Sequence, residues 1–404
     1  MKKDNIILNL ILFFSALATS LGIFMRLMHL SFPKEKVFDE VYFPVFAQDY
    51  LTRTTFFDVH PPFGKFLIAI GIKLFGFDEF GWRIIPAICG ILVVLGLGYI
   101  WYKWQKDWLG GVILAGFAAL DGLLITYSRT SLIDEVGLFV ILLAFLAAVL
   151  VKKRSHLIWL AILIGLAVSV KWLALGIIAP VAFIMWRKKL LKWFLLSLVI
   201  ACAIYILNIY LGQVIIRSSD PIQKIFTWHK ESMQFHLNLK DGHPWSSKWW
   251  SWPIFLRPVL FYYKDLVNGK IAVITSLPNP LLGWLSAASI ILSAWYLAVL
   301  KLLYRQKIAD HPLTIILIGF FAFWLPWAFA KRVFFIYHYL PSYSFALMSL
   351  TYWVSVAYKK YNWIALILVL GIFACGIYFI PFSVGTGLSS VWLSRHVWIN
   401  SWLY

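Results

Sequence analysis

Apolar runs about 20 residues long recur along the whole chain and limit its possible folds more than any other feature. A helix needs about 20 apolar residues to cross the hydrocarbon core of a bilayer. Eleven stretches are candidates for such a helix: 5–25, 82–102, 109–126, 132–151, 156–170, 172–186, 191–211, 281–303, 313–330, 334–355 and 361–380. Because 62% of the 404 residues are hydrophobic and only 13% are charged, the chain lacks the polar surface of a soluble protein. We therefore predict an all-α polytopic membrane protein with about 11 transmembrane helices.

The basic residues predict the orientation of the chain, because the 36 lysines and arginines outnumber the 17 aspartates and glutamates. With a cytoplasmic N-terminus, six short inner loops, the first beginning at Lys2 and Lys3, hold 16 basic but only 3 acidic residues, Asp4 among them. Cytoplasmic loops accumulate lysine and arginine in this way. The alternation holds throughout only if the fifth and sixth stretches, which meet at Lys171, cross separately. The net charge of +19 thus indicates topology rather than nucleic-acid binding, and places the C-terminus outside.

Two long hydrophilic segments, 26–81 and 212–280, lie on the outer face in this topology, together with the tail 381–404. We treat residues 1–404 as one membrane domain whose chemistry takes place on that face. The first apolar run resembles a signal peptide, but it continues past the Ala-Thr-Ser segment and is expected to be retained. The three cysteines all lie in apolar runs and are expected to serve helix packing rather than a disulfide or zinc site: Cys89, Cys202 and Cys375.

Asp39 and Glu40 form an adjacent acidic pair between apolar residues just beyond the first candidate helix. At a membrane surface, desolvation and mutual repulsion should raise the pKa of at least one of them, which suits a general base. A pair of solvated loop carboxylates explains the same pattern equally well.

A second motif, Phe-Phe-Asp-Val-His-Pro-Pro-Phe-Gly-Lys, follows at residues 56–65. The prolines after His60 fix an extended backbone, so Asp58 and His60 are expected on a rigid loop. Residues 65–76 are amphipathic and are expected to lie along the membrane interface.

At these two motifs the sequence resembles the protein O-mannosyltransferases, which are membrane glycosyltransferases of the GT-C fold that use a polyprenyl-phosphate-mannose donor. Further segments in the family's order extend the resemblance along most of the chain: Gly81–Ala87, Asp121–Glu135, Ser169–Trp172, Trp249–Pro253 with Arg257–Pro258, and Phe335–Pro341. Eukaryotic members carry a β-trefoil (MIR) domain between the seventh and eighth spans. Because segment 212–280 is too short for that domain, the chain resembles the compact bacterial members.

The resemblance implies that Asp39 takes the proton from a serine or threonine hydroxyl, which attacks the anomeric carbon of mannose with inversion. Glu40 would orient the acceptor or the first loop, although the base could also be Glu40. Asp58 and His60 would support the first loop or bind the acceptor.

Cations near the outer membrane surface suit a lipid-phosphate donor, since charges at such positions are costly unless functional or paired. Six basic residues lie at the outer ends of spans: Arg26, Arg83, Arg129, Lys171, Lys331 and Arg332. We expect Arg83 and Lys171 to be the foremost phosphate ligands. Arg26 is expected to steady Asp39 and Glu40.

The remaining donor-binding candidates each have an alternative interpretation. Arg129 either binds the donor or pairs with Asp121, Asp134 or Glu135. Arg332, with Lys331, either binds phosphate or extends to the interface as an ordinary basic side chain.

His338 lies in the Tyr-His-Tyr-Leu-Pro segment and is expected either to contact the donor or first loop, or to pack as an interfacial residue. His229, His236 and His243 recur every seven residues, but Gly242 and Pro244 would break a shared helix. We predict no metal site and no cofactor, and the resembled branch is regarded as metal-independent.

We therefore predict transfer of mannose to unfolded Ser/Thr-containing exported proteins at the outer face of the plasma membrane. Coupling to a secretion translocon is a further hypothesis. One alternative is a GT-C transferase that uses another lipid-phosphate sugar or a lipid acceptor. A different class, a polyprenyl-lipid transporter, is disfavoured because transporters concentrate polar residues at mid-membrane.

Overall fold

A computed structural model describes residues 2–240, 242–267 and 269–403 of the chain, and only the backbone of residues 2–4. The side chains of Lys2, Lys3 and Asp4, which enter the topology argument, therefore lie outside the described part.

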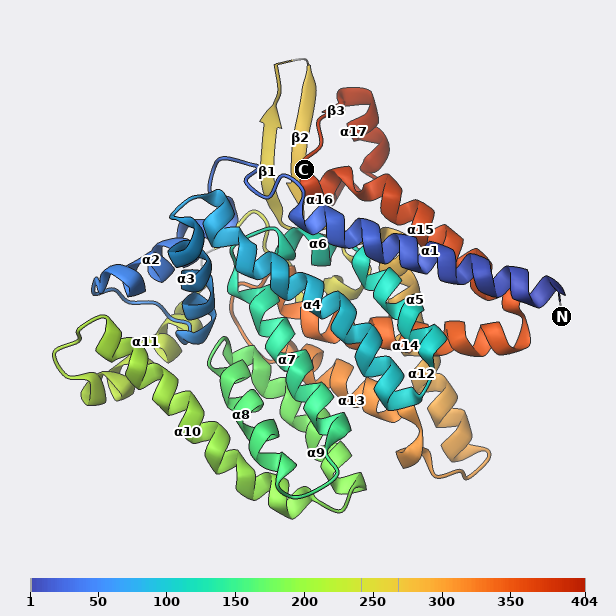
Figure 1. The fold of residues 1–404 in the computed structure, drawn as a ribbon, viewed down its shortest axis with the longest axis horizontal. Coiled ribbons are helices and arrows are strands. Elements are labelled where there is room, and N and C mark those ends of the chain that lie inside the picture. The colour runs from blue at the N-terminus through green and yellow to red at the C-terminus, as the bar shows by residue number, and fades with distance from the viewer. Residues whose placement is uncertain (1, 241, 268, 404) are drawn as a thin grey trace.

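Six helices in the described part are long and apolar enough to cross a membrane, or seven if a bent pair counts as one span. The six are α1 (Lys2–Leu27), α4 (Glu79–Gln105), α7 (Ile133–Leu150), α10 (Leu191–Ile215), α12 (Pro280–Leu302) and α15 (Asn362–Phe379). Figure 1 shows them in one helical body, with α1 lying along α5 and α15.

The remaining candidate spans coincide with shorter or more polar helices: α8 (His156–Val168), α9 (Ile178–Arg187), α13 (Pro312–Trp324) and α14 (Leu340–Lys360). A 3-10 turn, Trp172–Ile177, separates α8 from α9, so the expected break at Lys171 is present. The total of eleven crossings stays a prediction.

The third candidate span is not one helix as expected, but two helices bent by 66°, α5 (Trp108–Ala119) and α6 (Gly122–Ser128). Asp121 causes the break, since its carboxylate caps α6 by accepting from the backbone N–H of Leu124. The same carboxylate accepts from Asn279 N–H and from Tyr343 Oη–H at 2.8 Å. This buried acid therefore ties α6 to the start of α12 and to α14.

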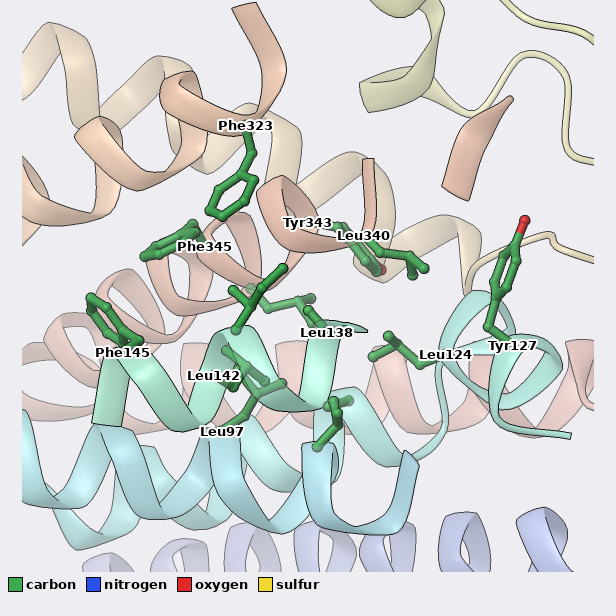
Figure 2. Close-up of a cluster of buried hydrophobic side chains, with 14 of the residues drawn as sticks. Leu97, Leu124, Tyr127, Leu138, Leu142, Phe145, Phe323, Leu340, Tyr343 and Phe345 are labelled. Atoms are coloured by element: carbon green, nitrogen blue, oxygen red, sulfur yellow. The ribbon is translucent and has the colours of Figure 1, made fainter. Parts of the chain in front are cut away.

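The hydrophobic core lies where α4, α7, α13 and α14 meet (Figure 2). Phe145 of α7 contacts Phe345 of α14 edge to face, with ring centroids 5.3 Å apart. Phe323 of α13 stacks on the other side of the same Phe345 ring. These aromatic contacts hold α7, α13 and α14 together.

The first outer segment folds into a 3-10 turn (Phe38–Val41) and two helices, α2 (Phe43–Thr52) and α3 (Phe63–Phe75). The α3 helix packs on α4 and exposes Ile70, Leu74 and Phe75 on its other side. Those exposed apolar side chains are compatible with the expected interfacial position.

The second outer segment and the C-terminal tail contain strands, which the all-α prediction missed. Strands β1 (Leu260–Asp265), β2 (Lys270–Thr275) and β3 (Leu388–Ser389) form an antiparallel sheet in the order β1-β2-β3. The hairpin stands out of the helical body beside the tail (Figure 1). The other elements of these two segments are α11 (Pro221–Asn238), α16 (Pro381–Val384), α17 (Ser390–His396) and 3-10 turns at Trp249–Ile254 and Asn400–Trp402. Two further 3-10 turns, Leu325–Ala328 and Ile336–Tyr339, lie between α13 and α14.

Candidate active site

Asp39 lies in the 3-10 turn that begins at Phe38, whose φ of 49° is unusual for a side chain of this size. The Asp39 carboxylate is half-buried and makes no hydrogen bond within the described part of the chain. Burial raises the pKa of Asp39 to about 7; the negative charge of Asp134 adds to the shift and the Lys171 ammonium opposes it. Asp39 is therefore a carboxylate poised to exchange a proton near neutral pH.

Glu40, the neighbour of Asp39, forms a buried ion pair with Arg83. Arg83 Nε donates to Glu40 Oε1 at 2.8 Å, and Arg83 Nη2 donates to Glu40 Oε2 at 2.7 Å. Glu40 also accepts from the backbone N–H groups of Val37 and Ser131, at 3.1 and 2.7 Å. Because its carboxylate is bonded to Arg83, Val37 and Ser131, Glu40 fixes the 3-10 turn that carries Asp39.

Arg83 does not have the free donors expected of a phosphate ligand. Its remaining N–H groups donate to the carbonyl oxygens of Leu30, Pro33 and Glu35, at 3.2, 2.8 and 3.1 Å. The side chain is fully buried. The geometry therefore gives Arg83 a supporting place under the first loop.

Arg26 was expected beside Asp39 and Glu40, but it turns into the helical body. It donates to the carbonyl oxygens of Gly22, Ala118 and Ala119 and to Ser128 Oγ.

Arg129 forms no ion pair with Asp121, Asp134 or Glu135 in the described part of the chain, although the sequence suggested one of them as its partner. Its guanidinium donates to the carbonyl oxygens of Met25, Met28 and His29, at 2.5, 2.6 and 3.2 Å. Arg129 thus holds the end of α1, where unpaired carbonyls favour a cation.

Lys171 lies close to Asp39 and has two partners. Its Nζ donates to Asp134 Oδ1 at 2.8 Å, and the same ammonium sits over the Tyr337 ring, 4.1 Å from its centroid. These contacts hold the Lys171 ammonium where its charge acts on the Asp39 carboxylate.

Asp58 and His60 meet at Lys65, which lies in the first turn of α3. Lys65 Nζ forms an ion pair with Asp58 and donates to the His60 carbonyl oxygen at 2.7 Å. Trp228 of α11 donates to the Asp58 carbonyl oxygen. Burial and the neighbouring cations lower the pKa of His60 well below its usual value, so its imidazole is neutral. The motif therefore forms a rigid joint between the two outer segments.

Arg332 approaches the same region through His236 of α11. Arg332 Nη1 lies 2.5 Å from His236 Nδ1, and burial with the Arg332 charge lowers the pKa of His236 to about 4. His338 is buried between the rings of Trp252 and Tyr337, and its Nδ1 lies 2.9 Å from the Phe335 carbonyl oxygen.

Two hollows flank this cluster. A cavity of about 640 Å³ beside Arg332 has a basic and aromatic lining that includes Lys240, Lys248, Trp249, Trp250, Trp327 and Lys331. A much narrower crevice is lined by Asp134, Lys171 and Tyr337 together with apolar residues of α7 and α14.

The three spaced histidines do not converge. His229 lies 2.8 Å from Tyr205 Oη, His236 contacts Arg332, and His243 Nδ1 accepts from Trp245 N–H. Within residues 2–240, 242–267 and 269–403, no three His, Cys, Asp or Glu side chains are placed to hold a metal ion.

Sequence reasoning missed two contacts of Lys171: its cation–π contact with Tyr337 and its ion pair with Asp134. Tyr337 and Asp134 both lie in segments that carry the family resemblance. The available signal was that Tyr337 precedes His338 and that Asp134 follows Arg129.

Three family models match parts of the chain, and the first two of these parts overlap. Residues 16–79 and 59–211 match two models described as dolichyl-phosphate-mannose-protein mannosyltransferase. Residues 221–402 match the C-terminal four-TMM region of protein-O-mannosyltransferase.

Curated relatives include bacterial and animal proteins. The polyprenol-phosphate-mannose–protein mannosyltransferase of Mycobacterium tuberculosis is 27% identical over 67% of this chain, which spans 64% of that protein's length. The Mycolicibacterium smegmatis protein of the same name is 26% identical over 78% of this chain and 75% of its own length. Protein O-mannosyl-transferase 1 of Danio rerio is 34% identical over 34% of this chain and 22% of its own length.

Solved structures share the fold. One is the Saccharomyces cerevisiae protein O-mannosyltransferase Pmt1-Pmt2 complex bound to the sugar donor, with a TM-score of 0.84, 16% identity and coverage of 100% of this chain and 93% of that one. Another is ArnT from Cupriavidus metallidurans bound to undecaprenyl phosphate, with a TM-score of 0.56, 15% identity and coverage of 91% and 73%. These likenesses agree with the predicted GT-C architecture.

Proposed function

Because the chain belongs to the protein O-mannosyltransferase family, we propose that it transfers mannose from a polyprenyl-phosphate-mannose donor to serine and threonine hydroxyls of exported proteins. The observation that carries the proposal is the Asp39 carboxylate, whose pKa is raised to about 7 and which lies beside the Lys171 ammonium. A base and a phosphate-binding cation at one place are what this reaction requires.

In the proposed reaction, Asp39 accepts the proton of the acceptor hydroxyl while the hydroxyl oxygen bonds to the anomeric carbon. The bond between that carbon and the phosphate oxygen breaks, and the polyprenyl phosphate leaves with the electron pair. Attack opposite the leaving group inverts the anomeric configuration. Lys171 and Arg332 would stabilise the charge that grows on the phosphate, while Glu40 and Arg83 hold Asp39 in place.

The proposed site faces the outside of the plasma membrane, in the topology that the charged loops predict. Acceptors would then be unfolded chains emerging from a secretion translocon. Site-directed crosslinks between the outer loops and translocon subunits during active secretion would support this coupling, and their absence would count against it.

The central test is transfer of radiolabelled mannose from polyprenyl-phosphate-mannose to a Ser/Thr peptide by purified protein. We expect labelled peptide, with or without EDTA, because Lys171 and Arg332 supply the cations. Labelled lipid in place of labelled peptide would favour a lipid acceptor, and transfer of another sugar only would change the donor. Movement of the lipid across vesicles without any transfer would favour the transporter.

Activity should depend on the protonation of Asp39. Only the carboxylate can accept a proton, so kcat/KM should fall about tenfold per pH unit below about 7 and level off above it. Initial rates between pH 5 and 9, with donor binding measured in parallel, would check this. A rate that stays flat down to pH 5 would contradict the assignment.

Lys171→Ala should weaken binding both of the donor and of bare polyprenyl phosphate, by about tenfold to a hundredfold, because both lose a charge-assisted contact. Competition binding in detergent would measure both affinities. Lys264→Ala, which removes an exposed lysine of β1, is the matched control and should change neither. Unchanged affinities for Lys171→Ala would exclude Lys171 as a phosphate ligand.

A further inference from the structure

Asp134 carries a buried oxygen that the protein leaves without a partner. The residue lies in the first turn of α7, and its side chain is 3% exposed. Oδ1 accepts from Lys171 Nζ at 2.8 Å, whereas Oδ2 has no hydrogen-bond partner in the described part of the chain. Since an unpaired buried carboxylate oxygen is costly, its retention needs an explanation.

The direction of Asp134 separates it from its neighbour Glu135, which also has one unpartnered oxygen. Glu135 faces the helical body, where Ser128 lies 3.4 Å from its other oxygen and the charge of Arg26 acts on it. Asp134 instead lines the narrow crevice with Lys171 and Tyr337.

Asp134 also acts electrostatically on the proposed base, Asp39. After burial, its negative charge is the largest influence raising the pKa of Asp39. Leu138 and Leu340, which belong to the hydrophobic cluster drawn in Figure 2, line the same crevice. The free oxygen is thus held close to both the phosphate-binding ammonium and the base.

The reaction chemistry indicates what must lie beside this crevice, whose volume of about 10 Å³ has room for one oxygen atom but not for a sugar ring. In the proposed function, on which this inference rests, the phosphate binds at Lys171 and the acceptor oxygen at Asp39. The anomeric carbon has to lie between them, so the sugar ring lies alongside Asp134. Sugar hydroxyls are hydrogen-bond donors, and a carboxylate oxygen is a strong acceptor for them.

We propose that Asp134 is a specificity residue that recognises the donor sugar, with Oδ2 accepting a hydrogen bond from one ring hydroxyl. The hydrogen bond from Lys171 to Oδ1 fixes the carboxylate, so that only Oδ2 is available to the sugar. A carrier that has lost its sugar offers no hydroxyl to Oδ2 and brings a more negative phosphate toward the same carboxylate. Asp134 therefore favours the sugar-loaded carrier over the spent one.

The first test compares affinities for polyprenyl-phosphate-mannose and polyprenyl phosphate in wild type, Asp134→Asn and Asp134→Ala. We expect the ratio of the two affinities to shift by about tenfold or more toward the bare phosphate in both variants. Glu135→Gln is the matched control, since it alters the adjacent carboxylate without touching the crevice, and should keep the wild-type ratio. An unchanged ratio in the Asp134 variants would overturn the proposal.

A second measurement does not depend on how well the Ala variant folds. Donors lacking one mannose hydroxyl at a time are compared on wild type and on Asp134→Asn, as a double-mutant cycle. One deoxy donor should bind wild type about tenfold more weakly yet bind the variant as well as the complete donor does. Equal losses in both proteins, or no loss in either, would refute the contact. If wild type itself does not distinguish mannose from other sugars, the proposed function fails instead.

Discussion

Replacing Asp39 by Asn is expected to lower the rate of mannosyl transfer by about 10²–10⁴-fold, the usual contribution of a positioned general base. The amide keeps the size of the side chain but cannot accept the acceptor's proton. Because Asp39 makes no side-chain hydrogen bond in the described structure, the fold should survive the change. The measurement is radiolabelled transfer at saturating donor, with thermal unfolding and donor affinity recorded on the same preparation.

Asp49→Asn is the matched control, since Asp49 lies in the same outer segment, on α2, and is not among the charges that shift the pKa of Asp39. It should retain activity within about twofold of wild type, as distant surface substitutions usually do. Transfer by Asp39→Asn within threefold of wild type would remove Asp39 from the chemistry. Glu40 would not easily replace it, because both Glu40 oxygens are already bonded to Arg83.

Arg83→Met is expected to destabilise the protein by about 3–5 kcal/mol, because it leaves Glu40 as an uncompensated buried charge. Activity should fall with it, since the turn that holds Asp39 loses its anchor. Glu40→Gln in the Arg83→Met background should recover part of the stability by removing that charge, but not the activity. Thermal unfolding and transfer assays on the two single variants and the double variant would separate the two effects.

The exposed pair of Lys264 and Glu35 provides the comparison for this ion pair. Both side chains are 54% exposed, so water screens their interaction and Lys264→Met should hardly change the unfolding temperature. Equal stability losses for Arg83→Met and Lys264→Met would contradict the structural role of the buried pair.

The sequence allowed the helical architecture and the family to be predicted, because apolar length and motif order are local properties of a chain. The break at Lys171 was foreseen because two short apolar runs meet there. The bend at Asp121 was not, since a single acid within an apolar run gives no indication that Asn279 and Tyr343 will bind it. The hairpin was also missed, although Asn268-Gly269 between two β-prone runs is a recognised turn signal.

The arginines show where sequence reasoning fails for the site. Arg26, Arg83 and Arg129 all lie at the expected ends of helices, yet their partners are mostly carbonyl oxygens from other parts of the chain. A carbonyl oxygen belongs to every residue, so no sequence pattern marks it as the partner of a guanidinium. Lys171 was distinguished from them only by its position between two short helices.

The binding of these carbonyl oxygens also has a consequence for how the nascent chain is assembled. The segment from Met25 to Pro33 spans the end of α1 and the loop after it and is made early, but carbonyl oxygens within it are bound by Arg83 and Arg129. Arg129 is synthesised 104 residues after Met25. Until then the carbonyl oxygens that Arg129 binds must remain hydrated, since lipid offers them no partner. The loop bearing Asp39 therefore reaches its final shape only after about a third of the 404 residues have been translated and inserted.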